Sequence, residues 1–353
     1  MKIINGRIEF VDVRAPSLAK GLVYIPSGEV SPGGIGGTIA CRMVTLLPMT
    51  RSPRAHTFSI VARDPVGGEL GAAVQSHWFG VGAAVTWAVA GVGVVATQAA
   101  IERSYGPRGL QLMGGGVPAR DALARLLATD DGRDTRQVAM VDAAGNVAAH
   151  TGARCVAYAG HAVGDGFSCQ GNIMAGPEVW PAMASAFESA RGDLAERLLA
   201  ALEAGQAAGG DARGRQSAAM LVVEGQARAE PWEGVLVDLR VDDHPDPIAE
   251  LGRLLQVHRA FEYMNRGDEQ LGGGEVAAAL ECYRAAATLL PHMAELSFWH
   301  AVALAGLGRM EEAQPLFRAV FAREPVWADI VRRLPAAGLL PNDVELMHRI
   351  LAP

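Results

Sequence analysis

Several residue types that mark specialised classes of protein are scarce in this chain. Only two of its 31 basic residues are lysines, Lys2 and Lys20, and the arginines are scattered over the sequence. Because the net charge is −7, there is no basic patch of the kind that binds nucleic acid, and we expect no such partner. The longest apolar run, 81–95, is glycine-rich and too short to span a bilayer. No apolar stretch typical of a signal peptide follows Lys2, so we expect a cytoplasmic protein without a membrane contact.

Cysteines are few and the histidines are dispersed along the chain, which argues against a metal site. The four cysteines, Cys41, Cys155, Cys169 and Cys282, form no CxxC pair. Buried free thiols in a reducing compartment are therefore favoured over disulfides or a zinc site. The sequence contains no HExxH motif, no GxSxG elbow, no P-loop and no dinucleotide fingerprint, so we expect neither a metal nor a cofactor.

The central part of the sequence is apolar and opens with an alternating stretch at Thr57. Residues 57–63 and 69–76 alternate in polarity around a Pro- and Gly-rich turn, which predicts a hairpin of half-buried strands. Two further apolar runs, 81–87 and 92–98, extend this block of strands. A sheet this apolar must be covered by helices on at least one face.

Helices are expected in the middle of the chain, and strands return after them. Further strands are predicted over 136–142, 147–151, 217–223 and 236–241, and another one ends near Cys169. Helices are predicted over 107–113, 118–128, 178–190 and 193–208. This order indicates an α+β layered domain over 57–255, with helices packed on a largely antiparallel pair of sheets.

Residues 1–56 differ in character from the domain that follows. A strand pair within 3–13 and a glycine-rich loop over 31–37 are the only local patterns. We favour a poorly ordered extension or a mis-annotated start, with Met43 and Met49 as alternative starts, over a propeptide. In either case we expect the native protein to begin at Thr57, or the extension to lie disordered over the site.

From residue 256 to residue 353 the pattern becomes helical and repetitive. Ala279, Tyr283 and Pro291 recur 34 residues later as Ala313, Phe317 and Pro325. This spacing, with Tyr263 and Gly267 upstream, resembles the tetratricopeptide repeat, in which the small residue lets two helices approach and the aromatic ring fills the groove between them. An unrelated helical hairpin is the alternative.

Two repeats and a fragment are short of the number that usually forms a stable stack. We therefore expect these helices to dock on the sandwich or to self-associate as a homo-oligomer, rather than to capture a peptide. The side chains expected to be buried are Leu280, Leu304, Phe317 and Phe321, with Trp299 at least partly so.

The polar side chains at strand ends are the candidate functional groups, since the surrounding strands are so apolar. They include Thr57, Ser76, His77 and Gln98. A threonine hydroxyl is a poor nucleophile without a base, but a threonine at the first position of a chain can use its own α-amine, whose pKa is about 7.7–8.0. Thr57 opens the first strand of the layered domain, which is where such a nucleophile belongs.

Six segments that follow one order along the chain resemble a known family. They are HTFSIVARDPVGGELG, VGVVATQA, SYGPRGL, QGNIMAGPEV, GGDARGRQSAAMLVV and VDLRVDDHPDPI. Together they resemble the family called domain of unknown function 1028, over about 57–255. Its members are grouped with the N-terminal nucleophile hydrolases, so the resemblance implies an αββα four-layer sandwich. It also implies a nucleophile at Thr57, close to which many members begin.

The resemblance also assigns roles around Thr57. Asn172 is implied as the donor to an oxyanion, a role that asparagine has in several of these hydrolases, and we expect it to lie near Thr57. Ser76, His77, Gln98 and Gln216 are our second choices, as groups that orient the reacting atoms. Gln216 and Arg215 are candidates for binding substrate, Arg215 through a carboxylate. Each also has a structural explanation: a turn cap, a partner for loop amides, or a solvated charge.

Two departures from the family affect this mechanism. An extension precedes Thr57, so its amine is blocked unless the extension is absent or removed. With Lys2 and Lys20 as the only lysines, no lysine base is available beside Thr57, and a freed α-amine must be the base. We expect an amidohydrolase acting on a small-molecule amide or peptide-like substrate. The alternative is a catalytically silent sandwich used for binding or assembly.

Overall fold

The computed structural model describes residues 2–4, 7–9, 54–55 and 57–352. The chain divides into two units, Met1–Ser52 and Pro53–Pro353, which we describe separately. In the first unit, β1 (Lys2–Ile4) and β2 (Arg7–Glu9) form an antiparallel pair, within the range where the sequence indicates two strands. The alternative starts Met43 and Met49 lie outside the described residues. The end of the extension was expected to be disordered, but Arg54–Ala55 form strand β3, which pairs with β7 (Gly93–Ala100).

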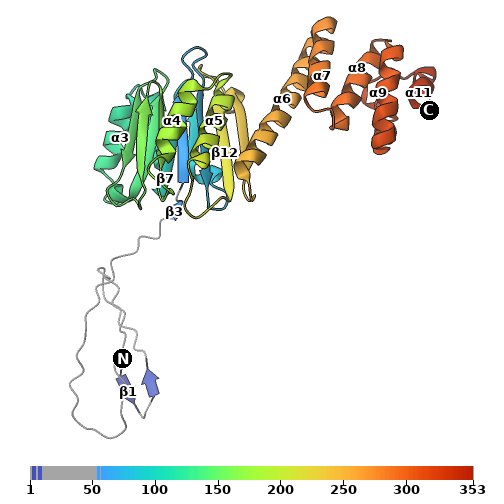
Figure 1. The fold of residues 1–353 in the computed structure, drawn as a ribbon. Coiled ribbons are helices and arrows are strands. Elements are labelled where there is room, and N and C mark those ends of the chain that lie inside the picture. Colours follow the sequence, from blue (N-terminus) through green and yellow to red (C-terminus); the bar gives the residue numbers. More distant parts are fainter. Residues whose placement is uncertain (1, 5–6, 10–53, 56, 353) are drawn as a thin grey trace, which may run out of the picture. The chain divides into compact units, whose positions relative to one another are not determined.

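The second unit begins with two antiparallel sheets (Figure 1). The six-stranded sheet has the order β10 (Gly160–Gly164), β11 (Phe167–Gly171), β4 (Thr57–Arg63), β5 (Leu70–Ser76), β12 (Ser217–Val223) and β13 (Val235–Val241). The five-stranded sheet contains β3 (Arg54–Ala55), β7 (Gly93–Ala100), β8 (Arg136–Asp142) and β9 (Val147–Thr151), with β6 (Thr86–Val89) paired to β7. The mixed α/β architecture with antiparallel sheets confirms the coarse fold class expected from the sequence.

Two expectations about individual strands were wrong. The apolar run 81–87 is not a strand throughout, because Gly82–Val85 forms the short helix α1 and β6 starts only at Thr86. A short buried run has no polar positions to reveal its period, so sequence alone does not separate helix from strand there. β4 was expected to be half-buried, but Thr57–Ala62 are buried on both faces.

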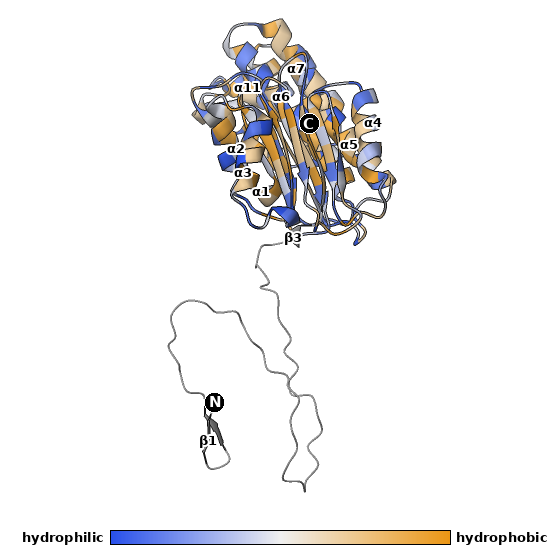
Figure 2. Ribbon diagram, turned by 90° about the vertical axis from the view of Figure 1, so that its left-hand side faces the viewer, coloured by the Kyte–Doolittle hydropathy of each residue, from blue (hydrophilic) through white to orange (hydrophobic). Residues whose placement is uncertain are grey.

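Helices cover the outer face of each sheet. Helices α4 (Val179–Ser189), α5 (Leu194–Ala207) and the start of α6 (Pro247–Gly272) pack on the six-stranded sheet. Helices α2 (Tyr105–Gly114) and α3 (Ala119–Ala128) pack on the five-stranded sheet, and the inner faces of the two sheets pack against each other. Figure 2 shows the resulting pattern, with largely hydrophobic strands between the helices.

The alternation of side chains along β4 explains why this strand lies at the centre of the layers. Phe58 and Ile60 point into the cluster beneath α4 and α5, whereas Val61 joins the cluster between the sheets. Burying each such side chain stabilises the fold by about 1.5–3 kcal/mol. On the neighbouring strand, a Cβ at Gly71 would lie 2.7 Å from Leu198 Cδ1, so only glycine lets α5 approach this closely.

Helix α5 begins where its sequence indicates a helix start. The Asp193 carboxylate accepts a hydrogen bond from the Glu196 amide at 2.9 Å, and Glu196 Oε2 accepts from the Asp193 amide at 3.1 Å. This reciprocal capping box satisfies two amide groups that have no partner within the helix.

The C-terminal part of the unit is entirely helical. It contains α6, α7 (Val276–Leu289), α8 (Ala294–Gly306), α9 (Met310–Arg323), α10 (Val326–Val331) and α11 (Val344–Leu351). Three-residue or four-residue 3₁₀ turns lie at Arg133–Thr135, Pro231–Gly234 and Pro335–Ala337. Helix α6 passes without interruption through residue 255, where the sequence suggested a domain boundary.

The helical core is close to the expected one. Leu280, Leu304 and Phe317 are buried, and Trp299 is partly buried, as expected. Phe321 was expected to be buried but is only half-buried, because it stacks on Phe317 at the edge of the core, with ring centroids 5.5 Å apart. Ile350 on α11 is fully buried in the same cluster, so the C-terminal segment itself covers part of the stack.

The cysteines of the described part are free thiols. Cys169 is buried as expected, whereas Cys155 and Cys282 are only half-buried, and Cys41 lies outside the described residues. None of the described helices combines the length and the apolar character that crossing a membrane requires.

Candidate active site

Thr57 lies at the end of the six-stranded sheet where the candidate residues gather. It opens β4, pairs with Ser76 at the end of β5, and its neighbour Phe58 pairs with Gly171 at the end of β11. Ser217 at the start of β12 pairs with the same Ser76. The antiparallel register thus brings the loops after β5, after β11 and before β12 to one edge.

The backbone and side chain of Thr57 are both fixed by hydrogen bonds. Its hydroxyl donates to Ser76 Oγ at 3.1 Å. Its carbonyl accepts from Gln98 Nε2 at 3.0 Å and from the Asn172 amide at 3.1 Å. The side chain is fully buried, as are those of Ser76, Gln98 and Asn172. Four of the sequence-predicted residues therefore meet in one cluster.

Gln137 on β8 is the residue that ties this cluster together, and the sequence analysis missed it. Gln137 Oε1 accepts from Gln98 Nε2 and from Asn172 Nδ2, each at 2.8 Å. Its Nε2 donates to the carbonyls of Gly171 and Gly160 at 2.8 and 3.0 Å, and to Thr151 Oγ1 at 3.0 Å. Since these partners come from both sheets, Gln137 links the sheets across the layer between them.

Further polar side chains extend this inter-sheet network away from Thr57. Ser59 donates to Gln98 Oε1 at 2.7 Å, and Gln170 Nε2 approaches Ser59 Oγ at 3.3 Å. All are buried. Buried amides of this kind cost free energy unless their hydrogen bonds are made, so the network orients each member strongly.

Asn172 lies beside Thr57, as the sequence predicted, but its side chain is not directed at an open space. Its Nδ2 lies 2.8 Å from Gln137 Oε1 and 3.4 Å from the Thr57 carbonyl. The following residue, Ile173, has φ of 54°, a left-handed conformation that turns the chain away from β11. The backbone amide of Asn172 also contacts Thr57, because it continues the pairing of β11 with β4 by donating to the Thr57 carbonyl.

His77, Arg215 and Gln216 lie in the loops next to this cluster rather than within it. The Gln216 amide donates to the Ser76 carbonyl at 3.1 Å, and its side chain donates to Asp243 at 3.2 Å. His77 Nδ1 lies 3.3 Å from the Arg215 carbonyl. The Arg215 guanidinium pairs with Asp246 at 3.1 Å, so a substrate carboxylate would have to compete with that acid.

Asp211 is a second residue that sequence reasoning missed. It is 3% exposed and accepts hydrogen bonds from the His77 amide at 3.1 Å and from the Arg213 guanidinium at 2.6 Å. An acidic residue in the glycine-rich loop GGDARG was the available signal, since a short loop of this kind often holds its backbone through a carboxylate. Asp211 fixes the loop that carries Arg215 and Gln216.

The titratable groups on the neighbouring strands are poor nucleophiles and bases near neutral pH. Burial raises the pKa of the Cys155 thiol, whose Sγ donates to the Arg136 carbonyl at 3.3 Å. Burial, and next the proximity of His150, lowers the pKa of His161, which lies 2.8 Å from Thr151 Oγ1. Neither group contacts Thr57.

The segment ahead of Thr57 is part of the five-stranded sheet. Arg54 pairs with Ala100 and Ala55 pairs with Ala99, at the end of β7. Among the described residues, no group of three or more His, Cys, Asp or Glu side chains is arranged to hold a metal ion.

The comparisons with known proteins identify the family of this region. A family model described as a family of unknown function, DUF1028, matches residues 57–251. The chain belongs to DUF1028. The DUF1028 region thus begins at Thr57, the first residue of β4, and ends within α6.

Solved structures are also similar to this chain, and we describe one of them. It is the crystal structure of protein SPO2555 from Silicibacter pomeroyi, itself matched to DUF1028, with 35% sequence identity and a TM-score of 0.52. The similarity covers 57% of this chain and 88% of that chain. No curated protein matches this chain.

Proposed function

We propose that the DUF1028 region is a sandwich of the N-terminal nucleophile hydrolase type and that it hydrolyses an amide bond in a small or peptide-like substrate. The order of its layers supports this proposal, since helices lie on the outer face of each sheet and the two sheets pack together. The observation that carries it is the position of Thr57, which opens a central strand and is the first residue matched by the family model.

In the proposed mechanism, Thr57 Oγ1 attacks the substrate carbonyl while the α-amine of Thr57 accepts the hydroxyl proton. The same amine returns the proton to the leaving nitrogen, and water then hydrolyses the ester. Ser76 Oγ, at 3.1 Å, orients the hydroxyl. Asn172, which lies against Thr57, is the proposed donor to the oxyanion.

This mechanism requires that the bond between His56 and Thr57 be absent. In the 353-residue chain the Thr57 nitrogen is an amide and has no basicity. With only Lys2 and Lys20 in the sequence, no lysine from the domain replaces it. Activity should therefore belong to a chain that begins at Thr57.

The test compares the full chain with a protein whose Thr57 is exposed by cutting a fusion at that residue. Both are treated with a small β-lactone, which acylates an activated hydroxyl and adds its whole mass. We expect the mass increase only in the chain that begins at Thr57, and not in its Thr57→Ala form. Equal labelling of all three proteins, or labelling of none, would count against the nucleophile. A panel of amide substrates then measures turnover with the same controls.

The alternative, a silent sandwich that binds or assembles, is favoured by a specific observation. Thr57, Gln98 and Asn172 are fully buried, and the side-chain amide of Asn172 donates a hydrogen bond to Gln137 Oε1. Buried side chains that hydrogen-bond to one another stabilise the fold without taking part in a reaction. If a chain that begins at Thr57 folds but takes no label, this second function is the better one.

For the helical part, we infer a stack of two tetratricopeptide-like pairs that serves self-association. Ala279 and Ala313 are fully buried at equivalent positions of α7 and α9, and Tyr283 and Phe317 likewise. Light scattering on the full chain over a range of concentrations tests the homo-oligomer. A monomer at every concentration would reject it.

A further inference from the structure

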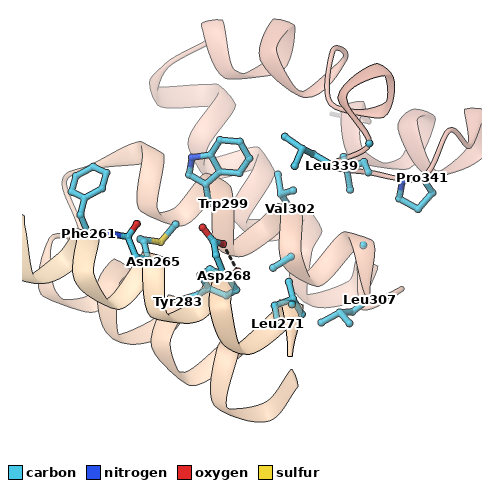
Figure 3. A pocket seen from close by; sticks show the side chains of 16 residues that line it. Phe261, Asn265, Asp268, Leu271, Tyr283, Trp299, Val302, Leu307, Leu339 and Pro341 are labelled. Carbon is cyan, nitrogen blue, oxygen red and sulfur yellow. Dashed lines mark hydrogen bonds between the residues drawn. The ribbon is translucent and has the colours of Figure 1, made fainter. Parts of the chain in front are cut away.

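A cavity of about 970 Å³ lies in the helical part, apart from the Thr57 cluster. Its walls are formed by the C-terminal half of α6, by α8 from Trp299 to its end, and by residues 338–341 (Figure 3). Tyr283 of α7 closes the floor. The volume is at the upper end of the range of small-molecule sites, roughly 300–1,000 Å³.

The wall of this cavity is apolar and rich in aromatic rings. Phe261, Tyr283 and Trp299 contribute rings, and the buried Val302 also lines the cavity. Leu339 is 55% exposed although it lies on the cavity wall, so apolar surface is left in contact with water. Burying that surface against an apolar ligand is favourable.

Asp268 is the one charged side chain among the described residues that line the cavity. Its Oδ1 accepts a hydrogen bond from the Tyr283 hydroxyl at 2.6 Å, and Figure 3 shows the carboxylate directed into the cavity. Asp268 takes part in none of the ion pairs found between described residues of the helical part. Asp268 is exposed, so its charge is solvated and is held in no ion pair with a described residue.

The surroundings hold Asp268 in this orientation. A Cβ at Gly267 would lie 2.8 Å from the Tyr283 ring, so the glycine lets that ring lie against α6 and reach the carboxylate. Burial, followed by the bond to Asp268, raises the pKa of Tyr283, which keeps the hydroxyl a donor. Burial, followed by Arg284, lowers the pKa of His300, which stacks on Tyr283, so that imidazole supplies no positive charge near neutral pH.

We propose that this cavity binds a small organic cation, an apolar or aromatic body that carries one protonated amine. The ammonium group pairs with Asp268 and lies near the faces of the aromatic rings, which attract cations through their quadrupoles. The body of the ligand covers Leu339 and the apolar wall. The same carboxylate repels anions, and a neutral ligand would offer it no opposite charge, so the charge selects the ligand class.

Calorimetric titration of the full chain with three compounds of one shape tests this proposal. The compounds are 4-phenylbutylamine, 4-phenylbutanol and 4-phenylbutyrate, whose terminal groups are positively charged, neutral and negatively charged, respectively. We expect the amine to bind at least tenfold more tightly than the alcohol and the carboxylate to bind least.

Two variants separate the charge from the cavity. Asp268→Asn keeps an acceptor for Tyr283, so we expect an unchanged melting temperature, an amine affinity reduced about tenfold and an unchanged alcohol affinity. Asp329→Asn removes an exposed carboxylate of α10 that pairs with Arg332, and should leave all three affinities unchanged.

Several results would overturn the assignment. Equal affinity for the three compounds would mean that the cavity is apolar and does not select by charge. No binding of the amine at millimolar concentration would rule out organic cations as the ligand class. Full amine affinity in the Asp268→Asn variant would show that the carboxylate plays no part. Tighter, Asp268-dependent binding of the peptide acetyl-Leu-Lys-Leu-amide would assign the cavity to a protein side chain instead. Dissociation of an oligomer by Asp268→Asn would assign it to a second copy of the chain.

Discussion

Replacing Gln137 by methionine should separate the two sheets more effectively than any other single change in the network. The substitution keeps the volume of the side chain but removes five hydrogen bonds that join β8 to β9, β7, β10 and β11. In this variant, Gln98 Nε2 still donates a hydrogen bond to the Thr57 carbonyl, and Thr151 Oγ1 still contacts His161 Nδ1. Those two groups should cost little.

The cost comes from the three remaining partners. Asn172 Nδ2 loses its 2.8 Å acceptor and keeps the longer 3.4 Å contact to the Thr57 carbonyl, and the carbonyls of Gly160 and Gly171 each lose a side-chain donor. At about 1–3 kcal/mol for a buried polar group that loses its partner, and with part of the loss regained by relaxation, the free energy of unfolding should fall by about 3–5 kcal/mol. That is a large share of the roughly 5–15 kcal/mol of a typical domain.

Urea unfolding of the full chain, followed by far-ultraviolet circular dichroism, measures this loss. The matched control is Gln111→Met on the exposed face of α2, which should change the free energy of unfolding by less than about 0.5 kcal/mol. A Gln137→Met protein that unfolds within 1 kcal/mol of the original, estimated as about the value of one hydrogen bond, would refute the view that Gln137 holds the sheets together.

Two other perturbations test packing and charge elsewhere in the fold. Gly267→Ala places a Cβ 2.8 Å from the Tyr283 ring, so overpacking should destabilise the chain by about 1–3 kcal/mol. At Gly272 a Cβ meets nothing within 4 Å, so Gly272→Ala should be neutral or stabilising. Thermal unfolding of the two variants measures the difference. Burial opposes the charge of Asp130, but hydrogen bonds from Arg136 and backbone groups outweigh it and hold the pKa of Asp130 below its usual value. The stabilisation is therefore present above the usual pKa, about 4, and is lost as the pH falls through the lowered value. In acid titrations, Asp130→Asn should be less stable than the original chain at pH 7 and should lose less stability as the pH falls towards 2. An equal loss in both proteins would contradict this assignment.

Much of the sheet architecture could be predicted from the sequence because local patterns and turn residues coincide there. The hairpin of β4 and β5 follows from alternation on either side of the turn at Gly67 and Gly68. Strand β10 was not predicted, because Gly160–Gly164 is glycine-rich and exposes part of each side chain at the sheet edge. Its pairing with β11 depends on the fold and not on its own residues.

The candidate site shows a similar division. The sequence led to Thr57 and Asn172, since both stand at the end of an apolar strand where a polar residue is conspicuous. Gln137 was overlooked because a polar residue at the start of strand β8 reads as solvent-facing, and only the packing of the second sheet turns it inward. Asp211 was overlooked because its partner His77 is distant in the sequence.

The contacts that position Thr57 also decide what the site can do in this chain. A nucleophile must be held at a fixed place, and the carbonyl of Thr57 is held by Gln98 and Asn172 from two other strands. The same bonds occupy donors that an oxyanion would need, and β3 continues the chain directly ahead of the nucleophile. Under the proposed mechanism, a Thr57 without a free amine is oriented but cannot hydrolyse an amide, whereas a Thr57 with a free amine carries the base and the hydroxyl on one residue. The state of the His56–Thr57 bond therefore separates the two functions, and the rest of the cluster serves either of them.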